Sequence, residues 1–147
     1  MQRKWTVLTG TMATCIALAT AVSMADDEKS PLHEIMEKVQ SNNTKITKGV
    51  RTQIAFAKQQ QDVVDAAKEL VKLAKEAKPI KDAVKKAKDV ENAGEKWDTM
   101  MDEFSKESDK FATFAAGKGV TSATAKAAYK KVSATCSACH AVFRVEE

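Results

Sequence analysis

Cysteine and histidine are scarce in this sequence of 147 residues, which holds three cysteines and two histidines. Cys15 lies in an apolar N-terminal stretch, whereas Cys136 and Cys139 stand three positions apart near the other end. A disulfide between these two would close a loop too short to stabilise a fold. A structural zinc site needs four ligands, and beyond these two cysteines and His140 the sequence after the apolar N-terminal stretch offers only His33 as a further Cys or His. The scarcity therefore argues against a disulfide scaffold and against a zinc domain.

Proline and aromatic residues are also few: two prolines, two tryptophans, one tyrosine and five phenylalanines. No segment shows the alternation of β-branched residues that is typical of strands, so we expect an all-helical chain. The lysine-rich segment 68–88 has no aromatic side chain for base stacking, and acidic residues stand among its lysines. This pattern indicates a solvated helix face and predicts no nucleic-acid binding.

The first 25 residues have the layout of a secretory signal peptide. A basic start, Met1–Lys4, precedes 18 uncharged residues, and the small residues Ser23 and Ala25 occupy positions −3 and −1 of a cleavage site. We expect cleavage after Ala25, export to the periplasm, and a mature protein of residues 26–147 without stable membrane insertion. An uncleaved anchor is the alternative, since about 18 apolar residues just span a bilayer.

The first helix of the mature chain has a clear start signal. Ser30 is placed to be the N-cap and Pro31 the first helical residue. The polar run Gln59–Asp62 is expected to form the turn that ends this helix. Its predicted apolar stripe consists of Leu32, Ile35, Met36, Val39, Asn43, Ile46, Val50, Ile54 and Ala57.

Three more amphipathic helices and a short connector are expected in the rest of the chain. Asp62 is predicted to cap the second helix, Pro79 to end it, residues 80–89 to form the connector, and Thr121 or Ser122 to cap the fourth helix. The stripe of the second helix is Val63, Ala67, Leu70, Ala74 and Ala77; that of the third is Trp97, Met101, Phe104, Ser108, Phe111 and Ala115; that of the fourth is Ala125, Tyr129, Val132, Cys136, Cys139, His140 and Phe143.

Four amphipathic helices with short connections predict an all-α fold, an antiparallel up-and-down four-helix bundle. Many stripe positions are alanine, which buries little apolar area, at about 0.8 kcal/mol per buried methylene. Such an interior either packs very closely or surrounds something large. A bound cofactor would supply the missing apolar volume.

The segment Cys136–His140, CSACH, is the attachment pattern for c-type haem. Residues i, i+3 and i+4 of a helix lie on one face, so both thiols and the imidazole project together. The thiols can then form thioethers with the porphyrin vinyl groups while His140 binds the iron as proximal ligand. A thioredoxin-like redox pair is the main alternative for Cys136 and Cys139. That pair is expected at a helix N-terminus after a strand, whereas this one lies near a helix end.

Two segments carry a resemblance to a known family. KWDTMMDEFSKESDKF (Lys96–Phe111) and AAYKKVSATCSACHAVFR (Ala127–Arg144) resemble the third and fourth helices of cytochrome c′ and its relatives, the class II c-type cytochromes. A late C-x-A-C-H followed by an aromatic residue and arginine is typical of that group. The resemblance is strong over roughly the last 50 residues and weak in the second helix; the up-and-down bundle it implies agrees with the fold expected above.

The resemblance also implies a group on the distal side of the iron. One branch of the family leaves that side to an apolar side chain, giving a five-coordinate iron that binds small gases. A second branch supplies a methionine, and alignment of the first helix puts Met36 there. Met36 lies about 40° from Leu32 on a helical wheel and His33 about 100° away, so Met36 points inward. The alternative is that Met36 only fills the core.

Arg144 matches a basic residue that the family carries beside the proximal haem face, where it would pair with a propionate or tune His140. The alternative is a cation favoured by the helix dipole. Met100 and Met101 are interpreted as core and rim of the third helix. The aromatic residues interpreted as core and haem packing are Trp97, Phe104, Phe111, Tyr129 and Phe143.

These observations predict a periplasmic monohaem cytochrome that carries single electrons and is not an enzyme. Haem c would be attached through Cys136 and Cys139, with His140 and Met36 as axial ligands and redox proteins as partners. The resemblance leaves a homodimer open. The alternative is a five-coordinate cytochrome c′ that binds nitric oxide or carbon monoxide. A bundle without haem, acting through protein contacts, is the third hypothesis.

Overall fold

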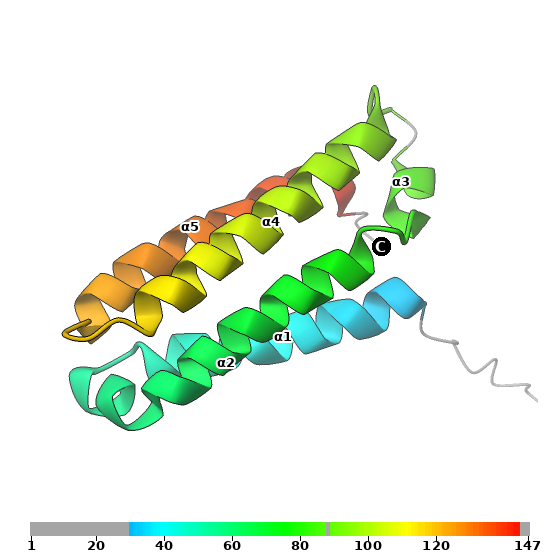
Figure 1. The fold of residues 1–147 in the computed structure, drawn as a ribbon. Coiled ribbons are helices and arrows are strands. Elements are labelled where there is room, and N and C mark those ends of the chain that lie inside the picture. Colours follow the sequence, from blue (N-terminus) through cyan, green and yellow to red (C-terminus); the bar gives the residue numbers. More distant parts are fainter. Residues whose placement is uncertain (1–29, 88, 145–147) are drawn as a thin grey trace, which may run out of the picture.

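A computed structural model describes residues 30–87 and 89–144, and the predicted signal peptide lies outside them. The described part is a bundle of helices without strands (Figure 1). Four helices are long and one is a short connector, which confirms the all-helical class. They are α1 (Pro31–Gly49), α2 (Gln53–Ala77), α3 (Asp82–Lys86), α4 (Ala93–Ala115) and α5 (Ser122–Phe143).

The start of α1 is as predicted, but its end is not. The Ser30 hydroxyl accepts a hydrogen bond from the His33 backbone N–H, and Pro31 begins the helix. The turn lies at residues 50–52, so the turn expected at Gln59–Asp62 is wrong. Thr52 caps α2, since its hydroxyl accepts from the Ala55 N–H.

The polar run that was expected to be a turn is a kink inside α2. Gln59 has φ −120° and ψ 15°, outside the helical region. The next residue, Gln60, donates its side-chain amide to the carbonyls of Ala115 and Gly117, at 2.7 and 3.2 Å. These carbonyls lie at the end of α4 and just after it, where the last carbonyl groups have no hydrogen-bond donor within the helix. The glutamine thus joins α2 to α4.

This shift in helix boundaries also corrects the predicted stripe of α1. Ile35, Val39 and Ile46 are buried as expected. Ile54 belongs to α2 and is 72% exposed, and Ala57 is exposed as well, so neither continues the stripe. Phe56 between them is the buried residue of that turn.

The later helices follow the sequence pattern closely. All six predicted stripe residues of α4 are buried. Asn92, in the left-handed region at φ 53°, precedes α4, a conformation that asparagine tolerates better than most residues. Thr121 caps α5 in a capping box with Thr124. In α5 the residues Ala125, Tyr129, Val132 and Phe143 are buried.

Neighbouring helices pack in the order α1 on α2, α2 on α4, and α4 on α5. The α2 face of these contacts is rich in buried alanine, with Ala66, Ala67, Ala74 and Ala77 all below 5% exposure. Small side chains let helices approach closely, so the alanines are explained by tight packing around α2. They do not form the walls of the large cavity described below.

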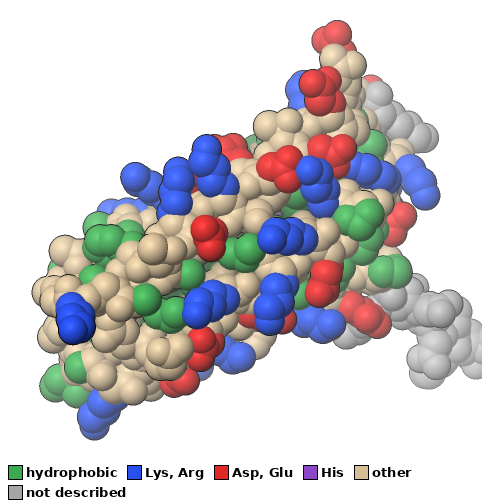
Figure 2. All heavy atoms as spheres, viewed as in Figure 1, with side chains coloured by type: hydrophobic (Ala, Val, Ile, Leu, Met, Phe, Trp, Pro, Cys, Tyr) green, Lys and Arg blue, Asp and Glu red, His purple; other side chains and the backbone are tan. Residues whose placement is uncertain are grey.

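The outer surface carries charges of both signs. On the face shown in Figure 2, lysine and arginine side chains alternate with aspartate and glutamate along the helices. Among the helices of the described residues, none is long and apolar enough to cross a membrane.

Candidate functional site

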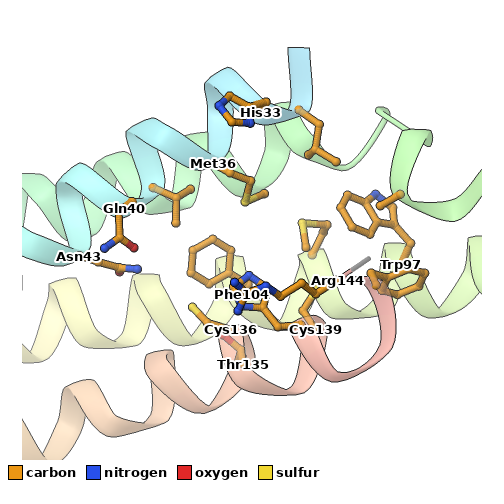
Figure 3. A pocket seen from close by; sticks show the side chains of 16 residues that line it. His33, Met36, Gln40, Asn43, Trp97, Phe104, Thr135, Cys136, Cys139 and Arg144 are labelled. Atoms are coloured by element: carbon orange, nitrogen blue, oxygen red, sulfur yellow. The ribbon is translucent and has the colours of Figure 1, made fainter. Parts of the chain in front are cut away.

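A cavity of about 590 Å³ lies between α1 on one side and α4 and α5 on the other. Its volume is within the range of small-molecule and cofactor sites. The cavity residues of α1 lie between Leu32 and Asn43, and those of α5 come from its C-terminal half (Figure 3). The cavity is lined by Leu32, His33, Met36, Val39, Gln40, Asn43, Ala83, Trp97, Met101, Phe104, Thr135, Cys136, Cys139, His140, Phe143 and Arg144.

Cys136 and Cys139 lie one turn apart on α5, and both line the cavity as half-buried free thiols. The Cys136 thiol donates to the carbonyl of Val132 at 3.5 Å. Burial raises the pKa of Cys136 above its ordinary value; burial, with a smaller effect of Cys136, raises the pKa of Cys139 to about 11. Both thiols are therefore protonated at neutral pH. A redox-active C-x-x-C pair needs the opposite shift.

His140 and Arg144 complete the α5 side of the cavity. His140 directly follows Cys139 and is exposed at the rim, where its imidazole can be reached from the cavity. Arg144 is the C-cap of α5, and its backbone N–H donates to the carbonyl of His140 at 3.1 Å. The guanidinium is the one arginine cation among the cavity residues.

Met36 faces this group from α1. Its half-buried side chain extends into the cavity, on the wall opposite Cys136 and Cys139 (Figure 3). His33 lies one turn earlier at the rim, 56% exposed, with its Nε2 3.4 Å from Glu37 Oε1. The thioether is thus better placed for a group inside the cavity than the second imidazole, in agreement with the helical-wheel expectation.

Aromatic and sulfur-containing side chains of α4 form one wall of the cavity. The Trp97 and Phe143 rings meet edge to face, with centroids 5.3 Å apart, and the Trp97 indole donates to the Lys78 carbonyl at 3.0 Å. Phe104 and Met101 are buried beside them and line the cavity, whereas Met100 is half-buried outside it. Met101 therefore presents a second thioether to the cavity, in addition to its expected core position.

Three neutral polar residues of the cavity were not predicted as site residues: Gln40, Asn43 and Thr135. Asn43 is half-buried and accepts a hydrogen bond from the Tyr129 hydroxyl. Tyr129 itself is buried and tilted against Phe111 at 5.1 Å, which agrees with its predicted core position. One feature of the sequence could have indicated Asn43 as a site residue: it is the one polar residue in the otherwise apolar stripe predicted for the first helix.

The set of side chains fits a covalently attached haem. Two neutral thiols, an imidazole and a thioether face one largely apolar cavity, with an arginine at its edge. Among residues 30–87 and 89–144, no three His, Cys, Asp or Glu side chains are arranged to hold a metal ion. Haem attachment needs only one such protein ligand beside the two thioethers.

Comparisons of the chain with protein-family models, with curated proteins and with solved structures found no match.

Proposed function

We propose that this chain is a periplasmic c-type cytochrome that carries single electrons on one covalently attached haem. The observation that supports it is the convergence of Cys136, Cys139, His140 and Met36 on one cavity from helices far apart in the sequence. In this proposal the chain is not an enzyme, its partners are redox proteins, and its sequence resemblance is to the methionine-ligated branch of the cytochrome c′ family.

The proposed architecture is an antiparallel up-and-down four-helix bundle made of α1, α2, α4 and α5. The order of helix packing supports it, because each long helix contacts the next along the chain. The short α3 would then be part of the connection between α2 and α4. One of its residues, Ala83, lines the cavity, so this connection would close the outer end of the site.

The register of α1 against α5 supports the pairing of Met36 with His140. Asn43 accepts a hydrogen bond from the Tyr129 hydroxyl and lines the cavity together with Cys136, so it lies opposite the stretch of α5 between these two residues. Met36 is seven residues before Asn43, about 10 Å along the helix axis. The same advance along α5, in the opposite direction, ends at Cys139 and His140. Met36 on α1 and His140 on α5 would therefore lie at the same level along the bundle, where they could bind one iron atom.

Each side chain has a distinct role in this proposal. Cys136 and Cys139 would hold the porphyrin by thioether bonds, and His140 and Met36 would be the axial ligands. When bound, haem supplies the one-electron redox couple, and a thioether ligand raises its potential. Phe104 and Trp97 exclude water from the cavity, and Arg144 provides a cation for a propionate. The chain thus supplies ligation, a dry surrounding and charge.

Mass spectrometry and a visible spectrum of the exported protein test this function. We expect the mass of the chain from residue 26 plus one haem, and a low-spin spectrum with the weak sulfur-to-iron charge-transfer band of methionine ligation. A mass without haem contradicts both cytochrome hypotheses. The remaining hypothesis would then be a bundle without haem that acts through protein contacts. Cleavage after Ala25 is read from the same mass.

A five-coordinate cytochrome c′ that binds nitric oxide or carbon monoxide is the second candidate. The observation that favours it is the apolar α1 wall, where Leu32 and Val39 flank Met36. It predicts a high-spin resting spectrum that Met36→Ala leaves unchanged, together with rapid carbon monoxide binding by the reduced protein. A low-spin spectrum that becomes high-spin in Met36→Ala contradicts it.

A further inference from the structure

We propose that Trp97 is a positioning residue that holds the last turn of α5, and with it His140, at the outer end of the cavity. This inference rests on the proposed binding of iron by His140, which both cytochrome hypotheses share. It gives Trp97 a role beyond filling the cavity wall. The role is carried by two contacts of the indole, one with the end of α2 and one with the end of α5.

The side chain of His140 depends on the helix backbone for its position. His140 is exposed at the cavity rim, and within the described residues no hydrogen bond fixes its imidazole. The helix ends four residues later at Arg144, whose N–H donates to the His140 carbonyl at 3.1 Å. Helix ends open more easily than helix interiors. The imidazole would therefore move with the last turn unless a contact with another helix holds that turn.

Phe143 provides this contact. It is the last residue of α5, it is buried, and it lines the cavity. It also lies three residues after His140, on the same side of the helix. The Phe143 ring meets the Trp97 ring edge to face, with centroids 5.3 Å apart, and such pairs stabilise beyond the area that they bury. Trp97 thus holds α5 one turn away from the proposed iron ligand.

The Trp97 indole is itself fixed from the other direction. Its Nε1 donates to the carbonyl of Lys78, the C-cap of α2, at 3.0 Å. Lys78 is in turn tied to α4, because its Nζ lies 2.6 Å from Asp102 Oδ1. The hydrogen bond sets the rotation of the indole, and therefore the orientation of the ring that Phe143 meets. Trp97 in this way connects the end of α2, the start of α4 and the end of α5.

The experiment compares Trp97→Leu with Phe111→Leu, both exported as full chains with haem. Phe111 is the matched control, because it is also a buried residue of α4 whose ring packs on an aromatic ring of α5, that of Tyr129, with centroids 5.1 Å apart. Tyr129 lies about three helical turns before His140. Hydrogen exchange followed by mass spectrometry compares peptides from the end of α5 with peptides from α1. The haem spectrum and far-UV circular dichroism are both recorded on heating.

We expect Trp97→Leu to accelerate exchange at the end of α5 about fivefold relative to α1, the effect of losing a ring contact and a hydrogen bond. On heating, its haem spectrum should change before helix content is lost, because the last turn of α5 opens while the rest of the bundle stays folded. Phe111→Leu should unfold at a lower temperature than the wild type, with both signals changing together.

Two further variants test the same contact. Trp97→Phe keeps a ring against Phe143 and lacks the donor to Lys78, so the local acceleration should fall to about twofold. Phe143→Leu removes the partner ring and should reproduce the local acceleration of Trp97→Leu. These variants provide the measurement if Trp97→Leu does not accumulate.

Three results would overturn the inference: unchanged relative exchange at the end of α5 in Trp97→Leu, simultaneous loss of its haem spectrum and helix content, or the same local acceleration in Phe111→Leu. Each would mean that Trp97 only stabilises the fold. A wild-type protein without haem would instead reject the proposed function, and with it this inference. The wild-type mass therefore separates the two failures.

Discussion

Replacing Gly49 by alanine should destabilise the fold, although alanine favours helices. Gly49 ends α1, and a Cβ added there would lie 2.3 Å from Cγ2 of Val63, far inside an ordinary contact. Val63 is buried and β-branched, so its side chain has little freedom to move away. Overpacking of this kind costs about 1–3 kcal/mol, whereas removing glycine from a helix interior gains about 1 kcal/mol at most.

We therefore expect Gly49→Ala to lower the free energy of unfolding by about 1–2 kcal/mol. Gly94 in the first turn of α4 is the matched control, because a Cβ there meets nothing within 4 Å. Gly94→Ala should raise stability by about 0.4–1 kcal/mol. Urea unfolding followed by far-UV circular dichroism measures both differences under the same conditions.

A Gly49→Ala protein as stable as the wild type would refute this reasoning. It would mean that α1 and α2 separate at low cost, and that the tight approach at Gly49 does not fix α1. Since α1 carries Met36 and Asn43, that result would also weaken the register on which the proposed site depends. A Gly49→Ala protein stabilised as much as Gly94→Ala would show that only helix propensity is being measured.

Other predictions address the site and its supports. Met36→Ala should convert the low-spin spectrum to high-spin, whereas Met101→Leu should leave it unchanged; visible spectra of the two variants compare the two thioethers of the cavity. Trp97→Phe should cost about 1–3 kcal/mol in urea unfolding, because the bond to the Lys78 carbonyl and part of the ring contact are lost. Gln60→Ala should lower stability by about 1 kcal/mol, because the two carbonyls at the end of α4 lose their donor; thermal unfolding measures it.

The helical class and most of the buried residues could be predicted because apolar residues recur at helical spacing, most clearly in α4. The α1–α2 boundary could not. Three consecutive glutamines are typical of a turn, but Gln60 has a partner 55 residues away in sequence that local pattern does not reveal. The true turn, residues 50–52, contains neither proline nor glycine. Gly49, the last residue of α1, is needed for the close approach of Val63 and not for a left-handed backbone.

The candidate site was predicted in part for a similar reason. The spacing of Cys136, Cys139 and His140 on one helix is a local property, so the sequence indicates their shared face. That Met36 lies across from them is a tertiary fact, which the helical wheel could only suggest. The hydrogen bond that places Asn43 at this cavity comes from Tyr129, 86 positions later, and no single-sequence pattern encodes such a pairing.

The cavity between α1 and α5 has a consequence for the order of folding. Its two walls are separated by about 100 residues, so closing it requires a long loop, whose entropic cost grows only slowly with length. The contacts of α2 with α1 and with α4 are more local and can form first. The pocket is then a late event in folding, absent from any nascent chain that has not yet completed α5. A chain that has not yet completed α5 would thus have α1 packed on α2 and Met36 exposed. It would become able to bind its cofactor only in the final step, when α5 packs on the other helices.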